Sequence, residues 1–459
     1  MLLGSGHIGA RTATSLDDWA PLTQERPSPS LDALPALAGQ SPANLVSYNP
    51  GGQPNGPARG PFTSWFRYPA GFSAQTLETC LDSVRVTRGS RVLDPFAGVA
   101  TAGCAVVARG GEFIGIEAHP LIAEVAALKF ACPREPAGLL AAGIAVLARD
   151  GHRSLELETT LVRSCFDEPT LTQLVKLRAA IKASRSPWRL YLKWALLAML
   201  RETANVRTGW PYQRPAMARR AVVKHVDRRF LERLSWMQAD LESRDAPANA
   251  TIILGDSRKP ATWVAAKKSP VDACIPSPPY LNNYDYLDAT RLEMYFWGDA
   301  HTWSDLMTIA RRDLVIATTH HTTDRAAFDS WRRLGRVSGV RERLTPLRDR
   351  LTEERHVRPR AKEYDRQLAC YFADMLAVLK NTSAAMLPGA RLAWVVGDSA
   401  PYGIYIDTPQ FICDLAEEVG LPPVSHPKFL RSRGLRWRTN GTRHTVGLAE
   451  SLLLLAKPG

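Results

Sequence analysis

The sequence predicts an α/β fold, with a mainly parallel sheet that carries helices on both faces. Two observations predict it. First, RVLDPFAGVATAGCAVVARGGEFIGIEAHPLIAEVAALKF, at 91–130, has the order strand, small-residue turn, helix, strand, helix. This β-α-β-α order is typical of a parallel sheet. Second, apolar strand patterns return much later, in ATIILGDSR, VDACIPSPPY, RLAWVVGDS and HTVGLAESLLLLAKP. The strands of the sheet therefore come from two separate parts of the chain.

Each remaining element follows from its pattern. SAQTLETCLDSV, at 73–84, spaces Leu77, Cys80, Leu81 and Val84 on one face of a helix. Residues 131–245 are mainly helical, as in AGLLAAGIAVLARD, LTQLVKLRAAIKAS and RLYLKWALLAMLRETA, and they include a basic, aromatic loop, VRTGWPYQRPAMARRAVVKHVDRRF. A stretch of this length exceeds an ordinary loop, so we expect a helical insertion subdomain. YFADMLAVLKNTSAAM predicts a further helix before the strand RLAWVVGDS.

These patterns divide the chain into four parts. Residues 1–60 are rich in Pro, Gly and Ser and predict a flexible N-terminal arm. Residues 61–130 hold the first part of the core, and 131–248 hold the helical insertion, which is a candidate for contact with nucleic acid. Residues 249–459 hold the second part of the core, with an Arg-rich helical segment at about 300–366.

Composition narrows the function classes. The net charge is +13 and the pI about 9.6, with arginine in excess. This charge suits contact with nucleic acid, and a basic surface without a specific partner is the alternative. No apolar run approaches the length of a membrane helix, and the first residues lack a secretory pattern, so we expect a cytoplasmic protein. Seven scattered cysteines without a CxxC pair favour neither a disulfide framework nor a zinc site, and we expect no metal.

Acidic residues at strand ends are the first candidates for a binding site. Asp94 ends one strand, Gly98 lies in the following turn, and Glu117 ends the next strand. An acid at the end of the second strand commonly holds ribose hydroxyls in Rossmann-like sites. A capping Asp in a plain strand-turn-helix is the alternative, and the stretch lacks the GxGxxG of nicotinamide and flavin sites. Asp256, at the end of a third strand, could accept a hydrogen bond from an adenine amino group.

Four motifs together resemble the S-adenosylmethionine-dependent DNA amino-methyltransferases, which methylate cytosine N4 or adenine N6. They are DPFAGVAT, GIEAHP, GDSR and SPPY, in this order. The resemblance covers 62–130 and 250–299 well and 370–459 loosely, and it implies a Rossmann-like methyltransferase sheet. The family's first motif is usually DPFxGxGT, whereas this chain has Ala100 at the second glycine. The added methyl group would be strained at positive φ and would lie near the expected ligand.

The resemblance also implies a cofactor site for S-adenosylmethionine. FRYPAGFSAQTLE resembles the segment that closes over the methionine end of the cofactor in this family. The positions that match the family's motifs are Pro69, Phe72, Asp94, Pro95, Phe96, Gly98, Thr101, Glu117, Asp256 and Ser257.

The SPPY turn is predicted to be a catalytic site that orients a base and its amine. The Ser277 hydroxyl and the Pro278 carbonyl can accept hydrogen bonds from an exocyclic amine, and Pro278 and Pro279 stiffen the turn because proline fixes φ. Tyr280 offers a flat face on which a base flipped out of the duplex could stack. A rigid turn after a buried strand is the alternative. Cytosine C5 methylation fits poorly, because Cys274 lies within the strand and not in the turn.

The predicted function is therefore methyl transfer from S-adenosylmethionine to the exocyclic amine of a flipped base in double-stranded DNA, with cytosine N4 favoured by SPPY. The alternatives are an N6-adenine DNA methyltransferase, an RNA guanine-N2 methyltransferase and a non-catalytic DNA-binding relative. A cognate restriction endonuclease is a candidate partner whose existence stays open, and no membrane partner is expected. The recognition sequence, the oligomeric state and the basic segment that reads DNA stay open.

Overall fold

The structure is a computed structural model. It describes residues 61–66, 68, 72, 74–131, 133, 135–149, 154–207, 214–218, 225–244, 247–281, 286–316, 322–337, 339–359, 361–426, 428–430, 438–439, 442–443 and 449–459. The arm predicted at 1–60 lies outside these residues.

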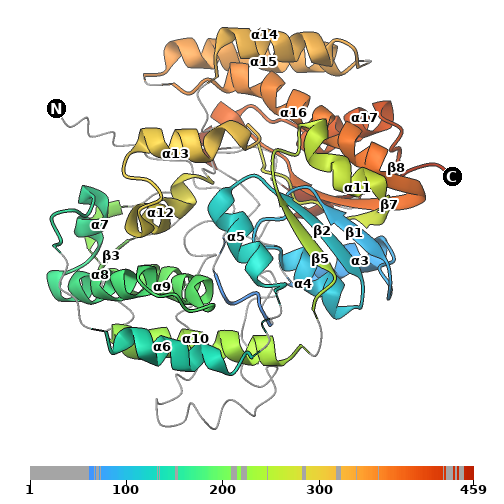
Figure 1. Ribbon diagram of the computed structural model, residues 1–459. Coiled ribbons are helices and arrows are strands. Elements are labelled where there is room, and N and C mark those ends of the chain that lie inside the picture. Colours follow the sequence, from blue (N-terminus) through green and yellow to red (C-terminus); the bar gives the residue numbers. More distant parts are fainter. Residues whose placement is uncertain are drawn as a thin grey trace.

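One eight-stranded sheet forms the centre of the fold (Figure 1). Its strands, in spatial order, are β5 (Ala250–Leu254), β2 (Glu112–Glu117), β1 (Arg91–Asp94), β6 (Val271–Cys274), β7 (Met386–Gly397), β12 (Ala449–Ala456) and β8 (Pro423–Ser425), with β9 (Lys428–Leu430) also paired to β12. The pairs from β5 to β7 are parallel, whereas β12 is antiparallel to β7, β8 and β9. This is the predicted Rossmann-like methyltransferase sheet.

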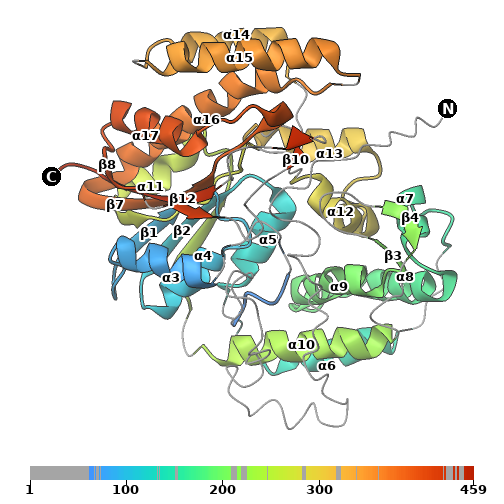
Figure 2. The same cartoon turned by 180° about the vertical axis from the view of Figure 1, so that it is seen from behind.

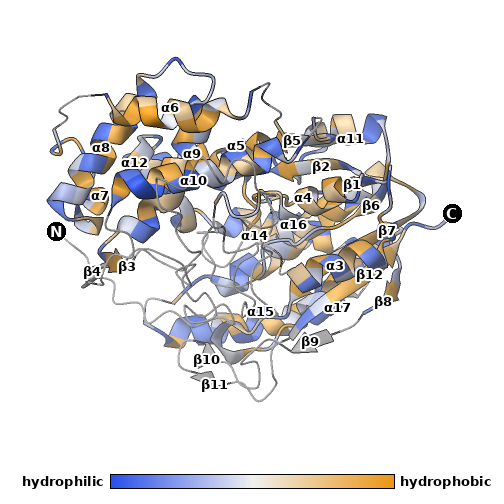
Figure 3. Cartoon of the chain, turned by 90° about the horizontal axis from the view of Figure 1, so that it is seen from below, coloured by the Kyte–Doolittle hydropathy of each residue, from blue (hydrophilic) through white to orange (hydrophobic). Residues whose placement is uncertain are grey.

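Helices cover both faces of the sheet, as predicted (Figures 1 and 2). They are α3 (Ala74–Ser83), α4 (Thr101–Ala108) and α5 (Pro120–Leu128) on one face, and α11 (Val264–Lys268), α16 (Tyr364–Ala385) and α17 (Thr408–Glu418) on the other. Side chains alternate between the faces along each strand: Val92 and Phe113 belong to the first core, and Leu93 and Ile114 to the second. In Figure 3, β7 and β12 carry mostly hydrophobic colour, as expected of strands buried on both faces.

The helical insertion predicted between the two parts of the core is present, and its exact limits stay a prediction. Its elements are α6 (Gly138–Leu147), α7 (Thr160–Cys165), α8 (Glu168–Lys182), α9 (Arg189–Thr203) and α10 (Val226–Glu242). Helix α9 is central: apolar side chains around most of its circumference are buried against α8, α10 and α5. The basic loop expected after α9 contains two short paired strands, β3 (Val206–Arg207) and β4 (Arg214–Ala218).

The Arg-rich segment forms an outer layer above the second face of the sheet (Figure 1). Helices α14 (Asp324–Leu334) and α15 (Val340–Val357) both pack on α16. Before them come α12 (Arg291–Trp297), which packs on α7 and α9, and α13 (Trp303–Ile309). Smaller elements complete the described fold: η2 (Pro260–Trp263), η3 (Asp288–Thr290), η4 (Arg311–Asp313), η5 (Pro401–Gly403), β10 (Arg438–Thr439) and β11 (Thr442–Arg443). Across the described residues, no helix is both long and apolar enough to cross a membrane.

Candidate functional site

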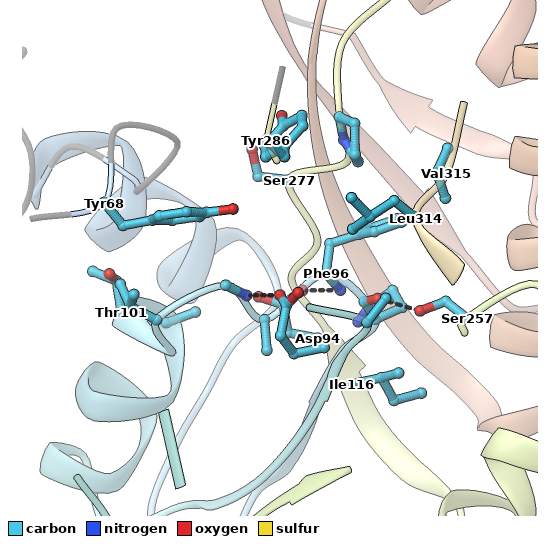
Figure 4. Close-up of a pocket in the computed structure, with 18 of the residues that line it drawn as sticks. Tyr68, Asp94, Phe96, Thr101, Ile116, Ser257, Ser277, Tyr286, Leu314 and Val315 are labelled. Carbon is cyan, nitrogen blue, oxygen red and sulfur yellow. Dashed lines mark hydrogen bonds between the residues drawn. The ribbon is translucent and has the colours of Figure 1, made fainter. Parts of the chain in front are cut away.

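A pocket lies at the carboxyl ends of the parallel strands, where β1, β2, β5 and β6 end side by side (Figure 4). Parallel register forces this arrangement, because Asp94 pairs with Gly115 near the end of β2, and Glu117 pairs with Leu254 at the end of β5. Ile275, just after β6, donates its amide to Leu93 O at 2.9 Å. Four loops that are distant in sequence therefore meet at one edge of the sheet.

The loop after β1 folds through hydrogen bonds and left-handed residues. Asp94 is buried, and its Oδ1 accepts the Phe96 amide at 2.8 Å. Gly98 has φ +52°, and Ala100 has φ +57° immediately before α4. The alanine that departs from the family motif thus occupies the left-handed region. Its side chain is fully buried in the core, and Ala100 is absent from the residues that line the pocket.

Glu117 ties the end of β2 to this loop. Its Oε2 accepts the Gly98 amide at 2.8 Å, and its Oε1 accepts the His119 amide at 2.7 Å. A carboxylate has about four acceptor positions, so each oxygen can still accept a hydrogen bond from a ligand. Glu117 therefore both shapes the loop and lines the pocket.

Asp94 and Glu117 are the buried carboxyl groups of the pocket, and a third lining acid, Asp313, is paired with Lys259 at 2.7 Å. Burial raises the pKa of Asp94 to about 8; the neighbouring Glu117 adds to this rise, and the Phe96 amide opposes it. Burial also raises the pKa of Glu117 to about 7, against the hydrogen bonds from His119 and Gly98. None of the described lining residues is a lysine or an arginine. A ligand that brings a positive charge would favour ionisation of both carboxyl groups.

An apolar wall faces these acids. Phe96 and Ile116 come from the first part of the core, and Leu314 and Val315 come from the Arg-rich segment. Figure 4 shows Leu314 beside Phe96, with Ser257 below them. Ser257 Oγ donates to the carbonyl of Pro95, so the end of β5 is attached to the loop after β1. A wall of this kind suits a flat, largely apolar ring system such as adenine.

The SPPY turn enters the same pocket. Ser277 and Pro279 line it, and Pro278 between them is buried and does not line it. The turn is held from the sheet, because Val395 of β7 donates its amide to the carbonyl of Pro276 at 3.1 Å. The Tyr280 hydroxyl donates to Glu450 Oε1 of β12 at 3.0 Å, which ties this side chain to the sheet.

The structure brings most of the predicted site residues together. Those that line this pocket are Phe72, Asp94, Pro95, Phe96, Gly98, Thr101, Glu117, Ser257, Ser277 and Pro279. Pro69 lies outside the described residues. Pro278 and Tyr280 adjoin the pocket in the chain without being among its lining residues.

Asp256 is placed differently from the other predicted residues. Its carboxylate is buried and pairs with Arg258 at 2.9 Å and Lys259 at 3.4 Å, and it does not line the pocket. Arg258 also pairs with Asp374 of α16 at 3.0 Å. In this arrangement Asp256 joins the end of β5 to α16, and the predicted contact with an adenine amino group would require the ion pair to rearrange.

The lining residues that the sequence analysis did not predict include Tyr68, Tyr286, Asp313, Leu314 and Val315. Tyr68 lies within the FRYPAGFS segment and Tyr286 follows SPPY by six positions, so proximity to a motif was an available signal for both. No motif marks Leu314 and Val315, which follow two arginines in an otherwise basic segment.

The sheet and the pocket together define a Rossmann-like methyltransferase architecture, and sequence comparison agrees with this class. The chain is similar to the Type II methyltransferase M.AvaI of Nostoc sp. and of Anabaena variabilis, with 23% identity over 392 residues, 78% of this chain and 78% of the relative. It is also similar to the Type II methyltransferase M.BsoBI of Geobacillus stearothermophilus, with 20% identity over 446 residues, 86% of this chain and 85% of the relative. The resemblance found in the four motifs is thereby confirmed. No protein-family model matches the chain.

Among solved structures, the chain is similar to TrmN from Thermus thermophilus, with 11% identity and a TM-score of 0.25, over 83% of this chain and 48% of that one. The chain thus spans about half the length of TrmN. It is also similar to the rRNA methyltransferase aviRa from Streptomyces viridochromogenes, with 11% identity and a TM-score of 0.30, over 95% of this chain and 94% of that one. The fold assignment rests on the strand order and directions described above, not on these scores.

Proposed function

We propose that this protein transfers a methyl group from S-adenosylmethionine to the exocyclic amine of a base in double-stranded DNA, with cytosine N4 as the favoured target. The observation that carries the proposal is the meeting of Ser277 with Asp94, Gly98 and Glu117 in one pocket. The SPPY turn and the acidic strand ends are separated by an insertion of more than a hundred residues, yet they face the same space. Similarity to Type II methyltransferases supports the proposal.

The pocket suits S-adenosylmethionine in charge and shape. Glu117 has acceptor capacity left for ribose hydroxyls, and the two buried carboxyl groups favour a ligand with cationic groups. The first amides of α4, at Thr101, suit the ligand's carboxylate, because the start of a helix carries partial positive charge. Phe96 and Leu314 form the wall for the adenine ring. When bound, S-adenosylmethionine supplies a methyl group on a positively charged sulfur.

The chain's own contribution to the reaction is orientation of the amine. The nitrogen lone pair of a base amine is delocalised into the ring, so the amine must be held with this lone pair toward the methyl group. Ser277 Oγ and the Pro278 carbonyl are the acceptors that we assign to the two amine hydrogens. Pro278, which is buried, and Pro279, which is partly buried, limit motion of these acceptors, and the hydrogen bond from Val395 holds the end of β6 from which the turn continues. The sequence predicted that the Tyr280 ring stacks on the base; its ring adjoins the pocket without lining it, and this role stays the alternative to the stacking surface proposed below.

A covalent cysteine route to cytosine C5 finds no support in the described site. Cys274 lies inside β6 and is fully buried. Burial raises the pKa of its thiol well above the ordinary value, which disfavours the nucleophilic thiolate. It does not line the pocket.

The test is modification-sensitive sequencing of DNA from cells that express the protein, together with calorimetry of S-adenosylmethionine binding. Methylated cytosine N4 in a fixed sequence context is the expected result. Adenine N6 methylation would support the same reaction class and replace cytosine by adenine as the target. Labelling of transfer RNA with no labelling of DNA would replace the proposal by the RNA alternative, and absence of S-adenosylmethionine binding would favour the non-catalytic relative. The Type II names of the relatives also make a cognate restriction endonuclease a proposed partner.

A further inference from the structure

Two tyrosines outside the SPPY motif, Tyr68 and Tyr286, line the same pocket as Ser277 (Figure 4). Their ring centroids are 6.5 Å apart, and the ring planes are tilted by 44°. Tyr280, the aromatic residue of the motif itself, does not line the pocket and is tied to Glu450. The pocket therefore contains a pair of rings that the motif does not account for.

The two rings are an ordinary tilted pair in the absence of a ligand. A flat ring held between two others needs them parallel and roughly 7 Å apart, because carbon atoms in contact stand ~3.5 Å from each other. The centroid distance of 6.5 Å is close to this value, so a planar base would be admitted if the rings separated slightly and turned from the 44° tilt toward parallel. Aromatic faces are sequence-tolerant partners for bases, since every base offers a flat face.

One wall of this slot is held firmly by the insertion. Asp240 of α10 accepts the Trp65 indole N–H at 2.7 Å and the Phe62 amide at 2.8 Å through the same oxygen. Phe66 packs edge-on against Trp194 of α9, with ring centroids 5.1 Å apart. These anchors lie just before Tyr68, so its backbone is attached to α9 and α10.

The other wall is held by the core and by α9. Leu287, next to Tyr286, is fully buried. Thr290 Oγ1 is hydrogen-bonded to His119 Nε2 at 2.8 Å, beside the end of β2. Arg201 of α9 pairs with Glu293 at 2.7 Å and also bonds to the carbonyl of Ala289. Described contacts thus attach the residues before Tyr68 and the residues after Tyr286 to α9 or α10.

We propose that Tyr68 and Tyr286 form a stacking slot that takes the planar target base and places its amine at Ser277. The slot rests on the proposed methyltransferase function and deepens it. Tyr68 has a second contact, because its ring lies over Gly98: a Cβ atom added there would stand 3.3 Å from Tyr68 Cε1. No atom of Tyr286 stands within 4 Å of that added Cβ, so Tyr286 gives the cleaner test.

The experiment measures single-turnover transfer of labelled methyl groups to DNA, with cofactor affinity measured by calorimetry on the same preparations. Tyr286→Leu is expected to slow transfer roughly tenfold to a hundredfold at saturating cofactor, the range for losing one stacked base. Its cofactor Kd should stay within about twofold of wild type, and Tyr286→Phe should restore most of the rate. Tyr295→Leu is the matched control: it removes a tyrosine of α12 that lies outside this pocket.

The outcomes separate the slot from the proposed function. A wild-type protein that transfers no methyl groups to DNA overturns the methyltransferase proposal itself. A wild-type protein that is active, with Tyr286→Leu at the wild-type rate and the loss confined to Tyr280→Leu, overturns the slot alone. A rate loss that disappears at saturating cofactor also overturns it, because Tyr286 would then act on the cofactor. If Tyr286→Leu does not fold, Tyr68→Leu and Tyr68→Phe are compared in the same way at saturating cofactor.

Discussion

Replacing Ala100 by glycine restores the family motif, and the structure predicts that this change does little. Ala100 has φ +57° and ψ 42°, a region that glycine enters freely and alanine does not. From the motif alone, the methyl group was expected near the ligand. In the structure the side chain is fully buried in the core, and Ala100 does not line the pocket. The substitution should therefore act on stability and not on cofactor binding.

Three terms decide the stability change. Glycine relieves roughly 1–2 kcal/mol of left-handed strain. It also makes the unfolded chain freer, which costs about 0.4–1 kcal/mol. Loss of the buried methyl group costs about 0.8 kcal/mol. The sum lies within about 1 kcal/mol of zero, so Ala100→Gly should be close to neutral.

Denaturant unfolding measures the free energy of unfolding, and calorimetry measures the cofactor Kd. The matched control is Gly98→Ala, which introduces the same strain at φ +52° and places a methyl group 3.3 Å from the Tyr68 ring, at a position that lines the pocket. We expect Gly98→Ala to lower stability and weaken cofactor binding, and Ala100→Gly to leave the Kd within about twofold. A fivefold or larger change in Kd for Ala100→Gly would refute the placement of its methyl group in the core.

Four further predictions follow from the described contacts. The pKa values of Asp94 and Glu117 are raised to about 8 and 7, above the ~4 of the unfolded chain. Their contribution to the stability of the ligand-free protein should therefore fall as pH rises from about 4 to 8. Thermal melts of wild type and Asp94→Asn across this range show whether the contribution falls or rises. Glu117→Ala should weaken cofactor binding by about 1–3 kcal/mol, measured by calorimetry, and should also lower stability, because two backbone amides lose their acceptor; Glu117→Gln should be milder in both respects. DNA affinity should fall steeply as salt concentration rises. Arg336 and Arg341 are exposed and have no ion pairs among the described residues, so replacing both by alanine should reduce the slope of log K against log salt concentration by roughly 1–2 if both touch phosphate. Binding titrations at several salt concentrations measure this slope. Asp240→Asn should cost about 1.5–3 kcal/mol of stability in denaturant unfolding, because it weakens two hydrogen bonds to a charged acceptor, and a cost near zero would show that the clamp is unimportant.

Local patterns were sufficient to predict the sheet. The strand at 91–94, the turn at 95–100 and the helix after it can be read from residue types, because parallel strands buried on both faces are continuous apolar runs. The acids at the strand ends follow from the same reasoning, since parallel register brings Asp94 and Glu117 to one edge. The helix that carries Leu77 is likewise where its spacing predicts it.

Contacts between distant segments could not be predicted in this way. Leu314 and Val315 reach the pocket because the Arg-rich segment passes over the end of the sheet, and no local pattern specifies that path. Asp256 is well placed in sequence for adenine, yet Arg258, two residues later, offers a stronger partner for its carboxylate. Motif position shows which loop a residue occupies. It does not show with which of several neighbours the side chain will form a hydrogen bond or an ion pair.

The insertion between β2 and β5 can be understood through the two walls of the pocket. A helical subdomain of this size was predicted as a candidate for contact with DNA, and that role stays a prediction. Its described contacts point inward as well, because Asp240 holds the segment before Tyr68 and Arg201 holds the segment after Tyr286. Neither Tyr68 nor Tyr286 itself lies in a helix or strand that could fix its ring. Anchoring both to adjacent helices, α9 and α10, gives the two rings a common support. A change in how these helices pack would therefore alter the separation of Tyr68 and Tyr286, and with it the fit of a base, while leaving the acids at the strand ends in place.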